Sequence, residues 1–155
     1  MALEIERKYL VHFDKWNSLE KPQGELYRQG YISKTPEKTI RVRLTDTTAY
    51  LTIKGAIRGI TRTEYEYEIP QEDAIALLDN FAETELSKVR YNVLYAEKIW
   101  EVDVFSGENE GLIVAEIELG SEDERYEIPE WISSEVTGIE RYYNSKLSIR
   151  PYKSW

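Results

Sequence analysis

The sequence contains no cysteine, and its 155 residues include a single histidine, His12. The lack of cysteine excludes disulfides and thiolate metal centres, and one histidine is too few for most of the familiar histidine-based catalysts and metal sites. Serines and threonines are plentiful, but they have no cysteine or partnered histidine to form a recognisable nucleophile and base. A metal ion bound by this chain must therefore be held by oxygen ligands.

Long apolar runs are also absent. No segment reaches the roughly eighteen consecutive apolar residues that cross a bilayer. The first residues, from Met1 to Lys8, lack the basic-then-apolar order of a secretory signal. We therefore expect a cytoplasmic protein with no membrane partner.

Positive charge is scarce. The chain has 29 acidic and 20 basic residues, a formal net charge of -9, whereas nucleic-acid binders present a broad basic surface. We expect no nucleic-acid partner, and a bound anion would need a local basic patch. The length suits a single domain over residues 1–155, which we expect to act as a monomer or homodimer.

Short runs rich in Ile, Val, Leu, Tyr and Thr alternate with turn residues, a pattern that indicates β-strands. Apolar residues at helical spacing between Pro70 and Phe81 predict one helix of about three turns. Three strands are predicted over residues 85–94, 98–105 and 112–119, followed by a short helix over 130–136 and a turn or helix near 141–148. About seven or eight strands with few helices predict a mostly β, α+β fold, either a closed antiparallel barrel or a strongly curved sheet with helices packed outside.

Charged residues recur at every second position along most of these strands. Side chains at such positions share one face of a strand, and the positions between them are mainly apolar. The strands therefore have one charged and one apolar face. The charged sets are Glu4, Glu6 and Lys8; Arg41 and Arg43; Lys54; Arg62, Glu64, Glu66 and Glu68; Lys88 and Arg90; Glu101 and Asp103; Glu116 and Glu118.

Two arrangements fit this alternation. On a single strand, a charged face usually faces solvent. Here, however, the charges are sorted by sign, Arg beside Arg and Glu beside Glu, and like-charged neighbours require counter-ions. Since almost every strand repeats the pattern, closing the sheet would gather these groups around one lumen. We therefore favour a barrel lined by charge, with a ligand inside and helices over the apolar exterior.

The two signs of charge in such a lumen suit two different partners. Arginine and lysine bind phosphate oxygens, and carboxylates bind Mg²⁺ or Mn²⁺. Carboxylates repel phosphate unless a metal ion lies between them. Both sets in one cavity therefore indicate a polyphosphate bridged by divalent metal.

Several motifs, in this order, resemble the CYTH superfamily of triphosphate tunnel metalloenzymes. The opening Glu4-Ile5-Glu6-Arg7-Lys8 is similar to its ExExK signature. Further matches along the whole chain are Gln29 to Ile32, Arg41 to Arg43, Thr52 to Gly55, Arg62 to Ile69, Lys88 to Arg90, Glu101 to Asp103, Glu116 to Glu118 and Tyr142 to Leu147.

The resemblance implies an eight-stranded antiparallel tunnel that binds triphosphate with Mg²⁺ or Mn²⁺. It implies that basic residues grip the phosphates, namely Lys8, Arg41, Arg43, Lys54, Lys88 and Arg90. It implies that acidic residues hold the metal, namely Glu4, Glu6, Asp103, Glu116 and Glu118. Glu64 and Glu66 then position water or balance charge, and the segment from Arg141 to Lys146 caps one mouth of the tunnel.

Hydrolysis of tripolyphosphate to pyrophosphate and phosphate is the function we favour, by attack of a metal-activated water assisted by a lysine or glutamate among Lys8, Lys54, Glu64 and Glu66. The alternatives are an adenylyl cyclase of the fourth class, a thiamine triphosphatase and a non-catalytic polyphosphate-binding module. A cyclase needs an aromatic or apolar shelf for adenine. Tyr27, Tyr31, Tyr50 and Trp100 are candidates for it, although packing is the more common role of such residues.

Overall fold

The computed structural model describes residues 2–155, and its main element is a sheet of nine strands. The strands are β1 (Leu3–Val11), β2 (Glu25–Thr35), β3 (Lys38–Leu44), β4 (Ala49–Gly55), β5 (Thr61–Glu68), β6 (Thr84–Tyr95), β7 (Lys98–Phe105), β8 (Ile113–Glu118) and β9 (Ile132–Glu135). The helices are α1 (Phe13–Ser18), α2 (Gln71–Asn80) and α3 (Asn144–Leu147), with short 3-10 turns η1 (Gly107–Asn109), η2 (Glu140–Tyr142) and η3 (Tyr152–Ser154).

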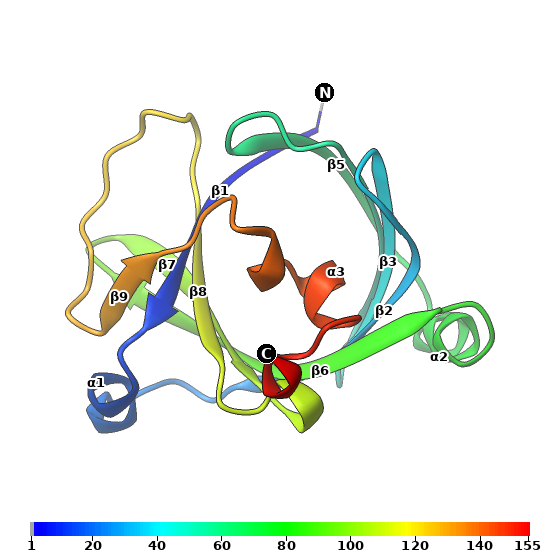
Figure 1. Ribbon diagram of the computed structural model, residues 1–155, viewed down its shortest axis with the longest axis horizontal. Coiled ribbons are helices and arrows are strands. Elements are labelled where there is room, and N and C mark those ends of the chain that lie inside the picture. The colour runs from blue at the N-terminus through cyan, green and yellow to red at the C-terminus, as the bar shows by residue number, and fades with distance from the viewer. Residues whose placement is uncertain (1) are drawn as a thin grey trace.

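The sheet closes on itself. Its order is β5-β4-β3-β2-β6-β7-β8-β1, with β9 attached to β1, and β1 also pairs with β5. Of nine strands, one lies outside the ring, so eight antiparallel strands form the closed barrel that the alternating pattern predicted (Figure 1). The seam is short, because β5 pairs with β1 only from Leu3 to Ile5.

β9 replaces the helix that the sequence predicted over residues 130–136. That prediction was wrong, because the apolar spacing of Trp131, Ile132 and Val136 also fits an extended segment. β1 continues beyond its seam with β5, and its edge from Tyr9 to Val11 is paired by β9. Tertiary pairing here overrides a weak local helical pattern.

Two apolar clusters cover part of the barrel exterior. α2 packs Ala74 and Leu78 against Val42 and Ala49, and a Cβ at Gly30 would lie 2.5 Å from Leu78, so this glycine permits the close approach of α2 to β2. On the opposite side, Trp16, Trp100 and Trp131 anchor a larger cluster over β1, β7 and β8. α1, which the sequence analysis did not predict, contributes Trp16 and begins where His12 Nδ1 accepts a hydrogen bond from the backbone N–H of Lys15 at 3.3 Å.

Helices leave the exterior of β5, and of β4 around Ile53, uncovered. Ile53 is 38% exposed, and Tyr65 and Tyr67 are 44% and 56% exposed. Helices therefore pack outside the barrel, as predicted, but leave this side of it exposed. No helix among residues 2–155 has the length and apolar character needed to span a membrane.

A third cluster lies inside the barrel. The C-terminal segment enters the ring of strands, where it is seen in orange and red in Figure 1. Its Val136, Tyr142 and Leu147 pack on inward-facing residues of β6, β7 and β8, including Phe105 and Val114. One part of the lumen is therefore filled by apolar side chains, and the charged side chains line the remainder.

We expect Leu147→Ala to lower the free energy of unfolding by about 2–5 kcal/mol, because it leaves a cavity in this internal cluster. Leu147 is fully buried, whereas Ile149 is 47% exposed. Ile149→Ala is the matched control, with an expected change within about 0.5 kcal/mol. Urea unfolding followed by circular dichroism measures both. Equal effects of the two substitutions would contradict a stabilising role for the C-terminal segment inside the barrel.

Candidate active site

The charged face of the barrel encloses a cavity of about 190 Å³. Strand alternation directs the predicted residues inward, and twelve of the thirteen line this cavity: Glu4, Glu6, Lys8, Arg41, Arg43, Lys54, Glu64, Glu66, Lys88, Arg90, Glu116 and Glu118. Asp103 is the remaining residue. It is fully buried behind the lining.

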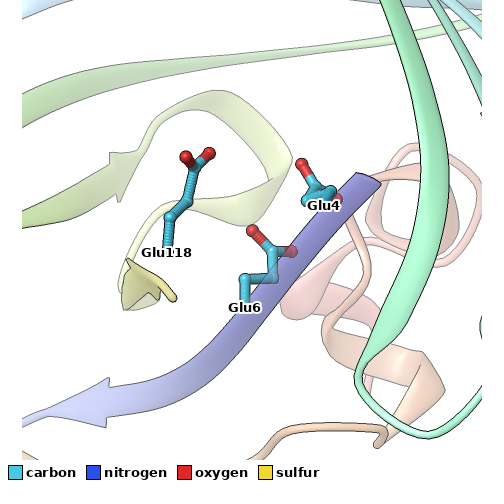
Figure 2. A group of neighbouring side chains, drawn as sticks. All are labelled: Glu4, Glu6 and Glu118. Atoms are coloured by element: carbon cyan, nitrogen blue, oxygen red, sulfur yellow. The ribbon is translucent and has the colours of Figure 1, made fainter. Parts of the chain in front are cut away.

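Three carboxylates form the acidic side of the cavity. Glu4 and Glu6 project from β1 and Glu118 from the end of β8 (Figure 2). One oxygen from each lies within 4.8 Å of the others. Glu6 and Glu118 are direct partners in the β1–β8 ladder, which places them side by side on the inward face.

The ionisation of these carboxylates differs. Burial raises the pKa of Glu6 well above its usual range, and the neighbouring Glu116 and Glu4 raise it further. Loss of hydration, followed by the effects of the neighbouring Glu101 and Glu4, raises the pKa of Glu118 to about 7, although its side chain is exposed.

Glu4 differs because it has cationic neighbours. Burial opposes its ionisation, but Lys54, a hydrogen bond with Glu64, and Arg62 together lower its pKa to about 2. The carboxylate of Glu4 lies 3.2 Å from both Lys54 Nζ and Arg62 Nε.

This group fits a divalent metal ion. Among residues 2–155, Glu6 and Glu118 form no ion pair with a basic side chain. Burial and then like-charge repulsion raise their pKa values, and a bound cation would offset both effects. Carboxylate oxygens are the ligands that Mg²⁺ and Mn²⁺ prefer. The donor set therefore suits such an ion.

Asp103 lies with the basic residues, apart from the three clustered carboxylates. Its Oδ1 accepts from Arg90 Nε at 2.8 Å, and its Oδ2 accepts from Arg90 Nη2 at 2.9 Å and from Lys88 Nζ at 2.7 Å. Arg90 and Lys88 lower the pKa of this carboxyl against the effect of burial. Both oxygens are thus already engaged with cations.

Glu116 lies between the two sides of the cavity. Its carboxylate is 3.9 Å from Lys8 Nζ. Burial favours its neutral form, yet Lys8, Arg90 and a hydrogen bond from Glu6 hold its pKa well below the usual range. Glu116 therefore links the acidic cluster to the basic residues.

Arg41 has fewer and longer contacts than Lys88 and Arg90. Arg41 Nη2 donates to Thr52 at 3.3 Å and lies 3.6 Å from Glu66. Its Nε is buried without a hydrogen-bond partner in residues 2–155. A buried donor of this kind is costly to leave unpaired. An anion in the cavity is a suitable acceptor for it.

Sequence reasoning considered Tyr31 only as a candidate shelf for adenine and gave Asn144 no role of its own. Tyr31, which is buried, lines the cavity from β2, and Asn144 lines it from α3. Asn144 Oδ1 accepts from Lys88 Nζ at 2.9 Å, and Lys8 Nζ donates to the carbonyl of Tyr142 at 3.3 Å. The family-like motif from Gln29 to Ile32 was a sequence signal for Tyr31, whereas the position of Asn144 depends on how the C-terminal segment packs inside the barrel. Lys146 is exposed.

Comparisons with known proteins agree with this geometry. The CYTH domain family model matches residues 2–148. A protein of Acetivibrio thermocellus named inorganic triphosphatase is 48% identical, over 100% of this chain and 99% of its own. A second inorganic triphosphatase, from Nitrosomonas europaea, is 34% identical over 94% of this chain and 97% of its own.

Solved structures show the same fold. The crystal structure of an inorganic triphosphatase superposes with a TM-score of 0.64 at 30% identity, covering 94% of this chain and 97% of that chain. A protein from Pyrococcus horikoshii superposes with a TM-score of 0.60 at 20% identity, covering 77% of this chain and 81% of that chain.

Proposed function

The chain belongs to the CYTH domain family, and from this premise we propose that it is a divalent-metal-dependent inorganic triphosphatase. The proposed reaction converts tripolyphosphate and water to pyrophosphate and phosphate. Two relatives named inorganic triphosphatase match this chain over nearly their whole lengths. The observation that carries the proposal is one cavity lined by seven basic side chains and by carboxylates that include the cluster of Glu4, Glu6 and Glu118.

The basic residues bind the triphosphate in this proposal: Lys8, Arg41, Arg43, Lys54, Lys88 and Arg90. Arginine supplies paired N–H donors to phosphate oxygens and lysine a point charge. The unpartnered Nε of Arg41 is a donor for one such oxygen. Asp103 holds Lys88 and Arg90 in place through its three hydrogen bonds.

Glu4, Glu6 and Glu118 hold Mg²⁺ or Mn²⁺, with Glu116 supporting them. The ion would neutralise phosphate oxygens and favour the attack of water. Glu64 and Glu66 position the attacking water and keep Lys54 and Arg41 in place, at 3.2 Å and 3.6 Å. Water adds to the terminal phosphorus as its bond to the bridging oxygen breaks, and that oxygen leaves with pyrophosphate. We retain Lys8, Lys54, Glu64 and Glu66 as the candidate catalytic residues.

The proposal also includes a cytoplasmic location and a monomer or homodimer with no nucleic-acid or membrane partner. The net charge of -9 supports the exclusion of nucleic acid. The lack of cysteine is compatible with any redox environment.

Product analysis tests the proposed function. Purified protein is given tripolyphosphate, ATP or thiamine triphosphate, each with Mg²⁺, Mn²⁺ or EDTA. We expect metal-dependent phosphate release that is fastest from tripolyphosphate and absent in EDTA. Cyclic AMP and pyrophosphate from ATP would assign the chain to the cyclases, fastest turnover of thiamine triphosphate would change the substrate, and binding without turnover would leave a binding module.

A further inference from the structure

Tyr27 lies beside two of the basic residues of the cavity without lining it. It is half-buried on the inward face of β2, between β3 and β6. The guanidinium carbon of Arg43 lies 4.8 Å from the centroid of its ring, and that of Arg90 lies 5.2 Å from the same centroid. One aromatic ring therefore contacts two cations that the proposed function assigns to phosphate binding.

The two guanidinium groups differ in their other partners. Arg90 has a paired contact with Asp103 and a further ion pair with Glu101 at 3.0 Å. Arg43 forms no ion pair within residues 2–155, and Gln29 Oε1 accepts from its Nε at 2.8 Å. Arg43 is thus held by a neutral amide and by the ring of Tyr27.

Arg43 is also surrounded by positive charge. Burial, together with the neighbouring Arg41 and Arg90, lowers its pKa to about 10. Aromatic rings attract cations over their faces at these distances. Arg43 has no carboxylate partner within residues 2–155, and the ring of Tyr27 provides part of the stabilisation that such a partner would give.

We propose that Tyr27 is a positioning residue for triphosphate binding, whose ring fixes the guanidinium groups of Arg43 and Arg90 so that their N–H donors meet the cavity. This proposal rests on the proposed function, because it assumes that both arginines contact the triphosphate. The ring itself does not contact the substrate. Without it, the two like charges would separate, and the donors would no longer be arranged in advance.

The test compares Tyr27→Leu, which removes the ring, with Tyr27→Phe, which keeps it. Among residues 2–155 the hydroxyl of Tyr27 makes no side-chain hydrogen bond, so we expect the Phe variant to behave as wild type. We expect the Leu variant to raise KM for tripolyphosphate about five- to tenfold, with kcat within about twofold, because contacts made equally in the ground and transition states affect KM. Leu26→Ala is the matched control, since Leu26 is the preceding residue on β2, points outward and is 52% exposed.

Calorimetry with tripolyphosphate in EDTA provides a second readout, independent of turnover. The dissociation constant should rise by a similar factor, about five- to tenfold, in Tyr27→Leu and not in Tyr27→Phe. Tyr27→Ile, which suits a strand, replaces the Leu variant if thermal unfolding shows that the latter does not fold.

Three results would overturn the inference: a ringless variant with unchanged KM and dissociation constant, a ringless variant that loses kcat alone, or a Phe variant as impaired as the Leu variant. Failure of the proposed function is distinguishable from these. Wild-type protein inactive on tripolyphosphate would overturn the function, and the calorimetric comparison would still decide the role of Tyr27.

Discussion

Replacing Glu4 and Glu6 together by glutamine is expected to lower kcat/KM for tripolyphosphate by at least about a thousandfold, which corresponds to about 4 kcal/mol of transition-state stabilisation. The two residues supply two of the three clustered carboxylates. Glutamine keeps the shape of each side chain and removes the negative charge that holds the metal. Phosphate release at saturating Mg²⁺ and Mn²⁺ is the measurement.

The same double variant should remain folded. Glutamine at position 6 removes a carboxylate whose pKa is raised by burial and by like-charged neighbours, which offsets the loss of the contacts of Glu4 with Lys54 and Arg62. Glu37→Gln, on the exposed hairpin between β2 and β3, is the control and should retain full activity. Unchanged turnover in the folded double variant would remove Glu4 and Glu6 from the metal site.

Asp103→Ala is expected to lower the free energy of unfolding by about 3–5 kcal/mol, because it leaves two buried cations without their shared carboxylate. Lys88 and Arg90 are 1% and 7% exposed, and Asp103 is fully buried. Burial lowers the pKa of Lys88 to about 7 even though Asp103 opposes that effect. Urea unfolding measures the loss.

Asp79→Ala is the matched control for this prediction. Asp79 also pairs with an arginine, Arg28, at 2.9 Å, but its side chain is 55% exposed. Exposed pairs contribute about 0–1 kcal/mol. Two roles have been proposed for Asp103, namely metal ligand and holder of Lys88 and Arg90. Calorimetric titration of the Asp103→Asn variant with Mn²⁺ separates them. Mn²⁺ affinity equal to wild type supports a positioning role, and a large loss of affinity would return Asp103 to the metal ligands.

Most of the barrel could be predicted from the sequence because strand alternation has a period of two. Alternation places Glu4, Glu6 and Lys8 on one face whatever the tertiary structure. Sorting by sign then distinguishes a lumen from a solvated surface, because Arg41 beside Arg43 requires a counter-charge. The structure confirms the closed barrel on this basis.

Features that depend on partners across the barrel could not be predicted in this way. Glu101 and Asp103 have the same residue chemistry and the same alternation, yet only Asp103 lies deep enough to meet both Lys88 and Arg90. The position of Asn144 depends on how Leu147 packs inside the barrel. The spacing of residues in the sequence does not give the position of a side chain along the barrel axis. That position decides which carboxylates face cations.

The seam at β1 also has a consequence for folding. β1 carries Glu4, Glu6 and Lys8, and it pairs with β5, β8 and β9, which lie far along the chain. Contacts between such distant segments require long loops to close first, and barrels of this kind fold in about milliseconds to seconds. A partly folded chain whose first strand has not yet paired with β8 has no complete carboxylate cluster, because Glu4 and Glu6 lie on β1 and Glu118 lies on β8. The proposed capacity to bind a metal ion therefore arises only when the first strand pairs with β8, near the other end of the barrel sequence.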